Sequence, residues 1–242
     1  MTGAVRTIAA RELQGYFATP LAYVFIVIFL ALTGLFTFYL GGFYERGQAD
    51  LAPFFNFHPW LYLFLVPAIA MRLWAEERRS GTIELLLTLP ISMVGAVVGK
   101  FLAAWIFYLL MMLLTAANPI LFYFYHPFDI APLLSAYLGM LLLGTAFIAC
   151  GLFISSLTEN QVLAAMGTYG VLIFFWFVTW NEEAGNKWVI GALLRLSLFD
   201  RFFNFSRGVI DTKDIAFFLL FTGLFLFLTL QSLNARKWRG VS

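Results

Sequence analysis

The chain has 242 residues, of which 62% are apolar and only 12% carry a charged side chain. That charged fraction is about half the value usual for soluble domains, and so much apolar surface does not fit into one small core, so the composition predicts an integral membrane protein. The net charge of +2 is dispersed and offers no basic surface for nucleic acid, while the single Cys150 excludes a disulfide or a thiolate metal cage within one chain.

The N-terminal segment, residues 1–19, has the pattern of a helix that lies flat in the cytoplasmic membrane interface. Arg11 lies on its polar side, whereas Glu12 projects within the apolar side, where an unpaired carboxylate is costly. Either Glu12 extends to water, or it pairs with a basic residue after the second apolar run, namely Arg72, Arg78 or Arg79. The apolar side comprises Val5, Ile8, Ala9, Leu13, Tyr16 and Phe17.

Six apolar runs without ionisable side chains follow, and they predict six transmembrane helices in an all-α fold. The runs are Leu21 to Leu40, Pro59 to Met71, Phe101 to Tyr125, Leu133 to Leu157, Val162 to Trp180 and Ile215 to Leu233.

Lys and Arg are distributed unevenly among the connections, which sets the expected orientation. A cytoplasmic N-terminus places nine of the 15 basic residues inside, and the other six outside, so both termini are expected in the cytoplasm. Residues 181–214 hold five of the outer six and are expected to form a partly inserted extracytoplasmic loop. The nine inner residues are Arg6, Arg11, Arg72, Arg78, Arg79, Lys100, Arg236, Lys237 and Arg239.

Several kinds of chemistry have no residues to support them. No predicted span has an ionisable residue at its centre, which argues against an ion-coupled carrier. The sequence GAVVGKF at 95–101 is too short for a phosphate-binding loop and lacks its hydroxyl, so it is better explained as a close helix contact, with Lys100 reaching the interface. His58 and His126 fall at outer span edges, which disfavours a metal or haem site and an intramembrane enzyme. We therefore expect no cofactor, no metal and no catalysis in this chain.

Small residues in the fourth and fifth runs allow helix backbones to approach closely. Gly144 and Gly167 are candidates for a dimer contact, although such glycines serve equally for packing within one subunit.

The cytoplasmic region 72–100, between the second and third runs, contains a charged block that breaks at Gly81 and stops before Pro90. The pattern predicts a short amphipathic helix in this region. The block resembles the permeases of ABC type 2 exporters, whose members carry an E-E-x-x-x-G-T-x-E-x-L-L-x-x-P pattern followed by G-K. The matching residues are Glu76, Glu77, Gly81, Thr82, Glu84, Leu86, Leu87, Pro90, Gly99 and Lys100.

Two further stretches are similar to the same family. RELQGYFATP, at 11–20, resembles its entry into the first span, and the stretch 196–229 resembles the approach to the last span in the gliding-motility-associated branch. The resemblance implies a single ABC type 2 permease domain over residues 1–242, in the bacterial inner membrane.

The same resemblance implies partners and a function. Two copies of a separate cytoplasmic ABC ATPase would drive the permease, which pairs with a second or homologous permease copy and, in some branches, with an extracytoplasmic accessory protein. ATP hydrolysis would then power export or transmit force across the membrane. The region 76–89 is the expected coupling helix, with Glu77 and Arg78 making polar contacts beside Glu76, Arg79 and the leucines. The alternative is a non-transporting scaffold or channel, for which few polar pore-lining residues are present.

Overall fold

The computed structural model describes residues 2–40, 51–83, 92–125, 129–177 and 196–239, which are helical with short connections and contain no strand. The all-α prediction is therefore confirmed for this part of the chain. The elements are α1 Thr2–Phe17, α2 Pro20–Leu35, the π-helical η1 Phe36–Leu40, α4 Ala52–Ala70, α5 Arg72–Arg79, α7 Met93–Thr115, α8 Ala117–Tyr125, α9 Ile130–Leu157, α10 Gln161–Phe177, α12 Leu198–Ser206 and α13 Thr212–Arg239.

Five helical runs are long and apolar enough to cross a membrane. Of the six predicted spans, the fifth is represented by α10, whose 17 residues extend about 25 Å, which is less than the roughly 30 Å of a hydrocarbon core. The second span is longer than predicted, because apolar residues before Pro59 extend α4 to Ala52. The five runs are Pro20–Leu40, Pro53–Arg79, Met93–Phe124, Ile130–Leu157 and Thr212–Ala235.

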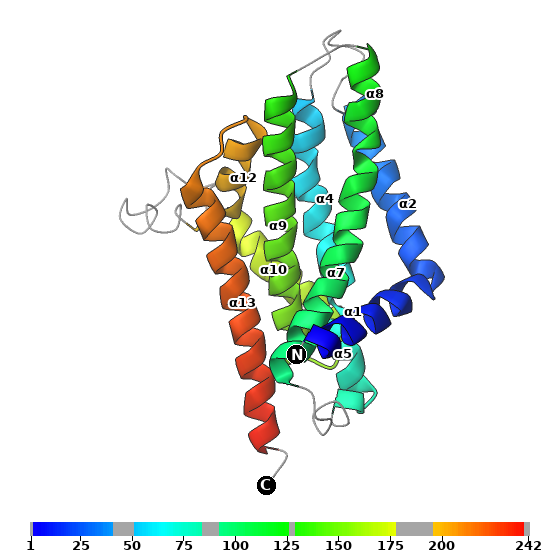
Figure 1. The fold of residues 1–242 in the computed structure, drawn as a ribbon, viewed down its shortest axis with the longest axis vertical. Helices are drawn as coiled ribbons and strands as arrows, with labels where there is room; N and C mark the ends of the chain where they lie inside the picture. Colours follow the sequence, from blue (N-terminus) through cyan, green and yellow to red (C-terminus); the bar gives the residue numbers. More distant parts are fainter. Residues whose placement is uncertain (1, 41–50, 84–91, 126–128, 178–195, 240–242) are drawn as a thin grey trace.

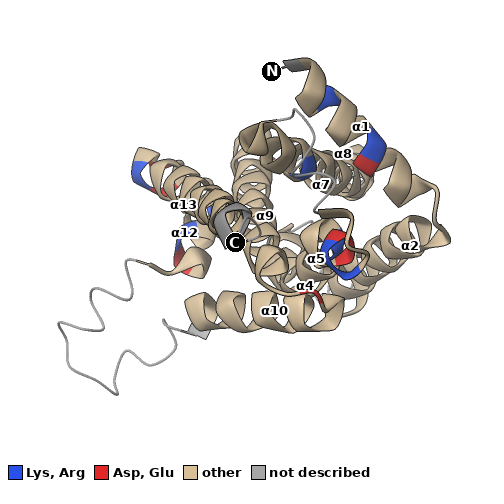
Figure 2. Ribbon diagram, turned by 90° about the horizontal axis from the view of Figure 1, so that it is seen from below, with Lys and Arg blue, Asp and Glu red and all other residues tan. Residues whose placement is uncertain are grey.

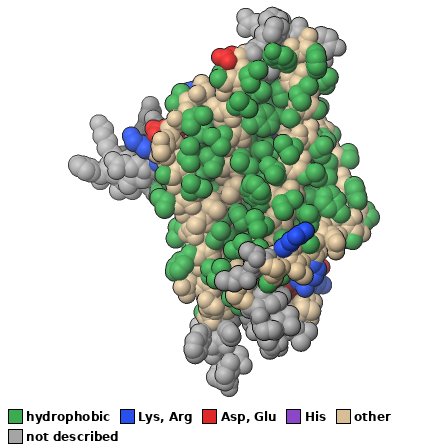
Figure 3. Space-filling model, viewed as in Figure 1, with side chains coloured by type: hydrophobic (Ala, Val, Ile, Leu, Met, Phe, Trp, Pro, Cys, Tyr) green, Lys and Arg blue, Asp and Glu red, His purple; other side chains and the backbone are tan. Residues whose placement is uncertain are grey.

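The helices form an elongated bundle around α9, against which α4, α7, α10, α12 and α13 pack (Figure 1). α1 crosses the base of the bundle at the end where α5 and the end of α13 lie, while α12 lies towards the other end. Hydrophobic side chains cover the middle of the visible face, and the charged side chains on it lie towards the ends (Figure 3). This distribution suits a protein whose sides contact lipid.

Glycines in α9 allow three neighbouring helices to approach it closely, since a Cβ atom at each would overlap a neighbouring side chain. Gly144 is buried against the Tyr108 ring, which is the packing within one subunit that the sequence analysis gave as the alternative to a dimer contact. Gly167 of α10 also has an intrachain neighbour, Ile154, whose Cγ2 would lie 2.9 Å from an added Cβ. The α9 contacts are Gly139 with Phe205 of α12, Gly144 with Tyr108 of α7 and Gly151 with Ala70 of α4.

The predicted outer loop, 181–214, falls partly outside the described residues, and its described part contains α12. This helix buries one apolar side while Arg201 pairs with Asp214 at the start of α13, 2.6 Å between Nη1 and Oδ1. Asn204 donates to the other Asp214 oxygen at 2.8 Å. The polar contacts fix α12 to α13 at the end of the bundle away from α5.

Candidate functional site

α5 continues directly from α4, and a side chain from α9 joins the two helices where the helical backbone breaks, at Met71. Ser155 Oγ accepts hydrogen bonds from the amides of Trp74 at 3.0 Å and Ala75 at 3.1 Å, and donates to the Met71 carbonyl at 2.9 Å. A hydroxyl has one donor and two acceptor positions, so Ser155 uses all of them here. The inserted hydroxyl accounts for the bend and attaches α5 to the central helix of the bundle.

A buried lysine joins three helices beside this bend. Lys100 of α7 is 1% exposed, and its Nζ lies 2.8 Å from Glu12 Oε1 of α1 and 2.9 Å from Glu77 Oε1 of α5. Arg11 Nη2 adds a second cation, 3.2 Å from Glu12 and 3.3 Å from Glu77. Two cations therefore balance two carboxylates in an ion cluster formed by Arg11, Glu12, Glu77 and Lys100. Trp74 covers it, with Nζ 5.0 Å from the ring centroid.

Lys100 is the partner of Glu12 that the sequence analysis did not identify. The expected partners Arg72, Arg78 and Arg79 make no ion pair with Glu12 among the described residues, and Lys100 points inward rather than reaching the interface. The spacing of the residues gives no signal for this pair, which depends on a close helix contact: a Cβ at Gly99 would come within 2.9 Å of Ile8, one helical turn before Glu12. The close contact permitted by Gly99 therefore places the next residue, Lys100, against the carboxylate.

Aromatic packing holds the other end of α1 on α7. Tyr16 stacks on Phe107 with ring centroids 5.3 Å apart, and Phe17 meets the same ring edge-on at 5.7 Å. Burial, with the nearby Glu12 carboxylate adding to it, raises the pKa of the Tyr16 phenol, so the hydroxyl stays protonated. It can therefore donate to the Ile69 carbonyl, 3.4 Å away.

Arg78 ties the last turn of α5 to the end of α9. Its Nη1 donates to the Ser156 carbonyl at 2.9 Å, and its Nη2 lies 3.4 Å from Glu159. Glu77 and Arg78, which the sequence suggested as contacts for a partner, are thus engaged inside the chain. Glu76 and Arg79 are the charged residues that this helix exposes.

The helix α5 ends next to Gly81, the glycine of the charged block between the second and third apolar runs. Gly81 has a φ of +69°, which side-chain-bearing residues rarely adopt. Ser80 Oγ donates to the Glu76 carbonyl at 2.9 Å and lies 2.9 Å from Thr82 Oγ1. Gly81 and Thr82 therefore terminate α5, whereas Glu84, Leu86 and Leu87 lie outside the described residues.

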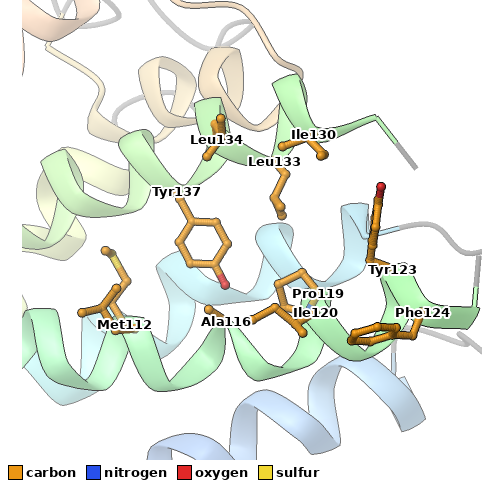
Figure 4. Close-up of a pocket in the computed structure, with 11 residues that line it drawn as sticks. Met112, Ala116, Pro119, Ile120, Tyr123, Phe124, Ile130, Leu133, Leu134 and Tyr137 are labelled. Carbon is orange, nitrogen blue, oxygen red and sulfur yellow. The ribbon is translucent and has the colours of Figure 1, made fainter. Parts of the chain in front are cut away.

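A second feature is an apolar cavity of about 480 Å³ between α7, α8 and the start of α9 (Figure 4). It lies where α7 and α8 separate at Ala116, next to Pro119, and Tyr137 points into it from α9. Thr115 Oγ1 donates to the Met112 carbonyl at 2.6 Å, so the polar group beside the break is satisfied locally. The walls contain no group suited to catalysis.

In the described ranges, no group of three or more His, Cys, Asp or Glu side chains could hold a metal ion. Figure 2 shows that Lys, Arg, Asp and Glu occupy α1, α5, and the region of α12 and α13, with few on the helices between them. The end of the bundle that contains α1, α5 and the ion cluster is thus the candidate functional site.

The family model described as ABC-2 family transporter protein matches residues 6–182, a range that includes most of α1, the bend and the ion cluster. Among curated proteins, no match to the chain is found.

Proposed function

Because the chain belongs to the ABC-2 family of transporter proteins, we propose that it is the transmembrane permease subunit of an ATP-driven exporter. Two copies of a separate cytoplasmic ATPase act on two permease copies. The chain crosses the bacterial inner membrane six times, with α10 as the fifth crossing, and both ends face the cytoplasm. α1 lies along the cytoplasmic membrane surface.

The attachment of α5 to its neighbours is the observation that carries this proposal. Ser155 joins α5 to α9, Lys100 joins it to α7 and α1, and Arg78 joins it to the end of α9. A displacement of α5 by an ATPase therefore moves several helices together, since packed helices respond as bodies rather than deforming continuously. The absence of charged residues from the predicted span centres fits an energy source outside the membrane.

The docking surface of the ATPase is the exposed side of α5 together with the segment up to residue 89. Arg79 replaces Glu77 and Arg78 as its polar contact, because the latter two are bound within the chain. The predicted leucine contacts, at Leu86 and Leu87, lie outside the described residues and remain part of the proposal.

The test is site-directed photocrosslinking in native membranes. We expect a photoreactive residue at Arg79 to capture a subunit that contains a phosphate-binding loop, and one at the exposed Val209, towards the opposite end, to capture none. The variant Arg79→Glu should reduce copurification of that ATPase, while the helical content stays unchanged. If position 79 captures no ATPase and Arg79→Glu changes nothing, the scaffold alternative is favoured.

A further inference from the structure

A small polar cavity lies beside the ion cluster, between α1 and the first turn of α5. Its volume is about 270 Å³. It is lined by Arg11, Glu12, Gly15, Tyr16, Thr19, Arg72, Leu73 and Glu76. Glu12 and Arg11 are already neutralised within the ion cluster, so Arg72 and Glu76 supply the charges that are available to a ligand.

Arg72 and Glu76 have opposite charges and lie one helical turn apart, yet they do not pair with each other. Such a pair usually stabilises a helix by about 0.2–0.5 kcal/mol, but no ion pair within 4.0 Å joins the two in the described structure. Arg72 lines the cavity and forms no ion pair with a carboxylate of the described residues. Its guanidinium charge is therefore available to an anionic acceptor from outside the chain.

The cavity lies at the level of the membrane surface if α1 is interfacial. Thr19 lines it, and the first spanning helix begins at the next residue, Pro20. Beyond it, α2 exposes Tyr23, Val24 and Val27, apolar side chains that suit contact with acyl chains. A ligand in this cavity would therefore occupy the position of a phospholipid headgroup, at the membrane surface and next to the acyl chains.

We propose that this cavity binds the headgroup of phosphatidylethanolamine from the cytoplasmic leaflet. The guanidinium of Arg72 holds the phosphate, for which its planar donors are suited, and the Glu76 carboxylate accepts hydrogen bonds from the ammonium group. Phosphatidylcholine fits less well, because its quaternary ammonium has no N–H to donate and is better recognised by aromatic cages. Phosphatidylglycerol fits less well, because it leaves Glu76 without a cation.

A lipid bound here would fill the space between α1 and α5 and hold these helices together. The inference rests on the proposed interfacial position of α1, but not on ATPase coupling, so it is tested on the purified permease alone. Loss of lipid preference would then leave the ATPase crosslinking result unaffected.

The experiment titrates delipidated full-length protein with short-chain phosphatidylethanolamine, phosphatidylcholine and phosphatidylglycerol of equal chain length, with bound lipid counted by native mass spectrometry. We expect the wild type to prefer phosphatidylethanolamine. Arg72→Gln should weaken its binding about tenfold or more, as expected from loss of a charged hydrogen bond. Glu76→Gln should reduce it to the level of phosphatidylcholine. The matched control Arg6→Gln removes an exposed cation of α1 that does not line the cavity, and should leave binding unchanged.

Equal retention of the three lipids by the wild type would overturn the proposal without any variant, as would preference for phosphatidylglycerol. Equal binding of phosphatidylethanolamine by the wild type and by folded Glu76→Gln would also overturn it. A separate titration measures the binding of free O-phosphoethanolamine. If it binds as tightly as the lipid, the ligand is a soluble phosphate compound and the lipid assignment is wrong.

Discussion

Lys100 and Glu12 are 88 positions apart in the sequence, yet the Lys100 ammonium lies 2.8 Å from the Glu12 carboxylate. The contact joins α1 to α7, and Glu77, on the other side of the same ammonium, adds α5. Because the lysine is almost fully buried, its charge is tolerated only while both carboxylates stay in place. The position of α1 is thus coupled to that of α5.

Replacing Lys100 by Met should destabilise the permease strongly. The change leaves two largely buried carboxylates with only Arg11, and breaking a buried pair in this way costs about 3–5 kcal/mol. Partial exposure of Glu12 and Glu77, 20% and 16%, places the expected loss at the lower end of that range. The apparent melting temperature in detergent measures it. Lys213→Met, at an exposed lysine, is the control, and adding Glu12→Gln to Lys100→Met should recover part of the loss.

Replacing Ser155 by Ala should loosen the bend between α4 and α5. The amides of Trp74 and Ala75 lose their acceptor, and buried donors left unsatisfied cost about 1–3 kcal/mol. Hydrogen exchange of the segment 72–79 should accelerate in the variant. Ser156→Ala is a matched control, because its buried hydroxyl only donates back to the Phe153 carbonyl of its own helix. Equal exchange in the two variants would refute the assigned role of Ser155.

Replacing Gly144 by Ala should lower stability without changing the oligomeric state. The new methyl group overlaps the Tyr108 ring, whose hydroxyl is also held by a 2.6 Å hydrogen bond to the Met140 carbonyl, so the ring has little freedom to move. Overpacking of this kind costs about 1–3 kcal/mol. Gly34→Ala, where an added methyl group has open space, should have a much smaller effect. A reduced oligomer mass at unchanged melting temperature would instead place Gly144 at a dimer contact.

Replacing Gly167 by Leu tests the dimer expectation at the second candidate. The larger side chain meets Ile154 within the chain, so some loss of stability is expected in any case. A dimer role predicts an additional decrease in oligomer mass, measured in nanodiscs. Gly170→Leu, at a position on the same helix with open space around an added Cβ, provides the comparison.

Cysteine accessibility should establish the orientation, in a Cys150→Ala background. Arg79→Cys is expected to react with a membrane-impermeant reagent only after the membrane is opened, whereas Val209→Cys should react in intact cells. Both positions are exposed in the structure. Arg79 ends α5, and Val209 lies in the connection between α12 and α13, towards the opposite end of the bundle. The reverse labelling pattern would invert the proposed topology.

The sequence by itself determined the membrane class, the positions of most helices and the charged segment that ends at Gly81. These features depend on runs of apolar residues, on charges that must reach water and on a glycine that adopts a positive φ, all of which are local. α10 shows the limit of this approach, because apolar character alone does not decide whether a 17-residue helix crosses the bilayer.

Only the tertiary structure decided which residues meet. Helical periodicity identifies the side that a helix buries but not the helix that covers it, so Lys100, Ser155 and Gly144 could not be matched with Glu12, Trp74 and Tyr108 from their spacing. Glu77, which matches the family pattern, and its neighbour Arg78 were expected to face a partner, yet they are bound inside the chain. The physical reason is that a charged side chain near a membrane can either reach water or find an opposite charge, and only the packing of helices distant in sequence shows which occurs.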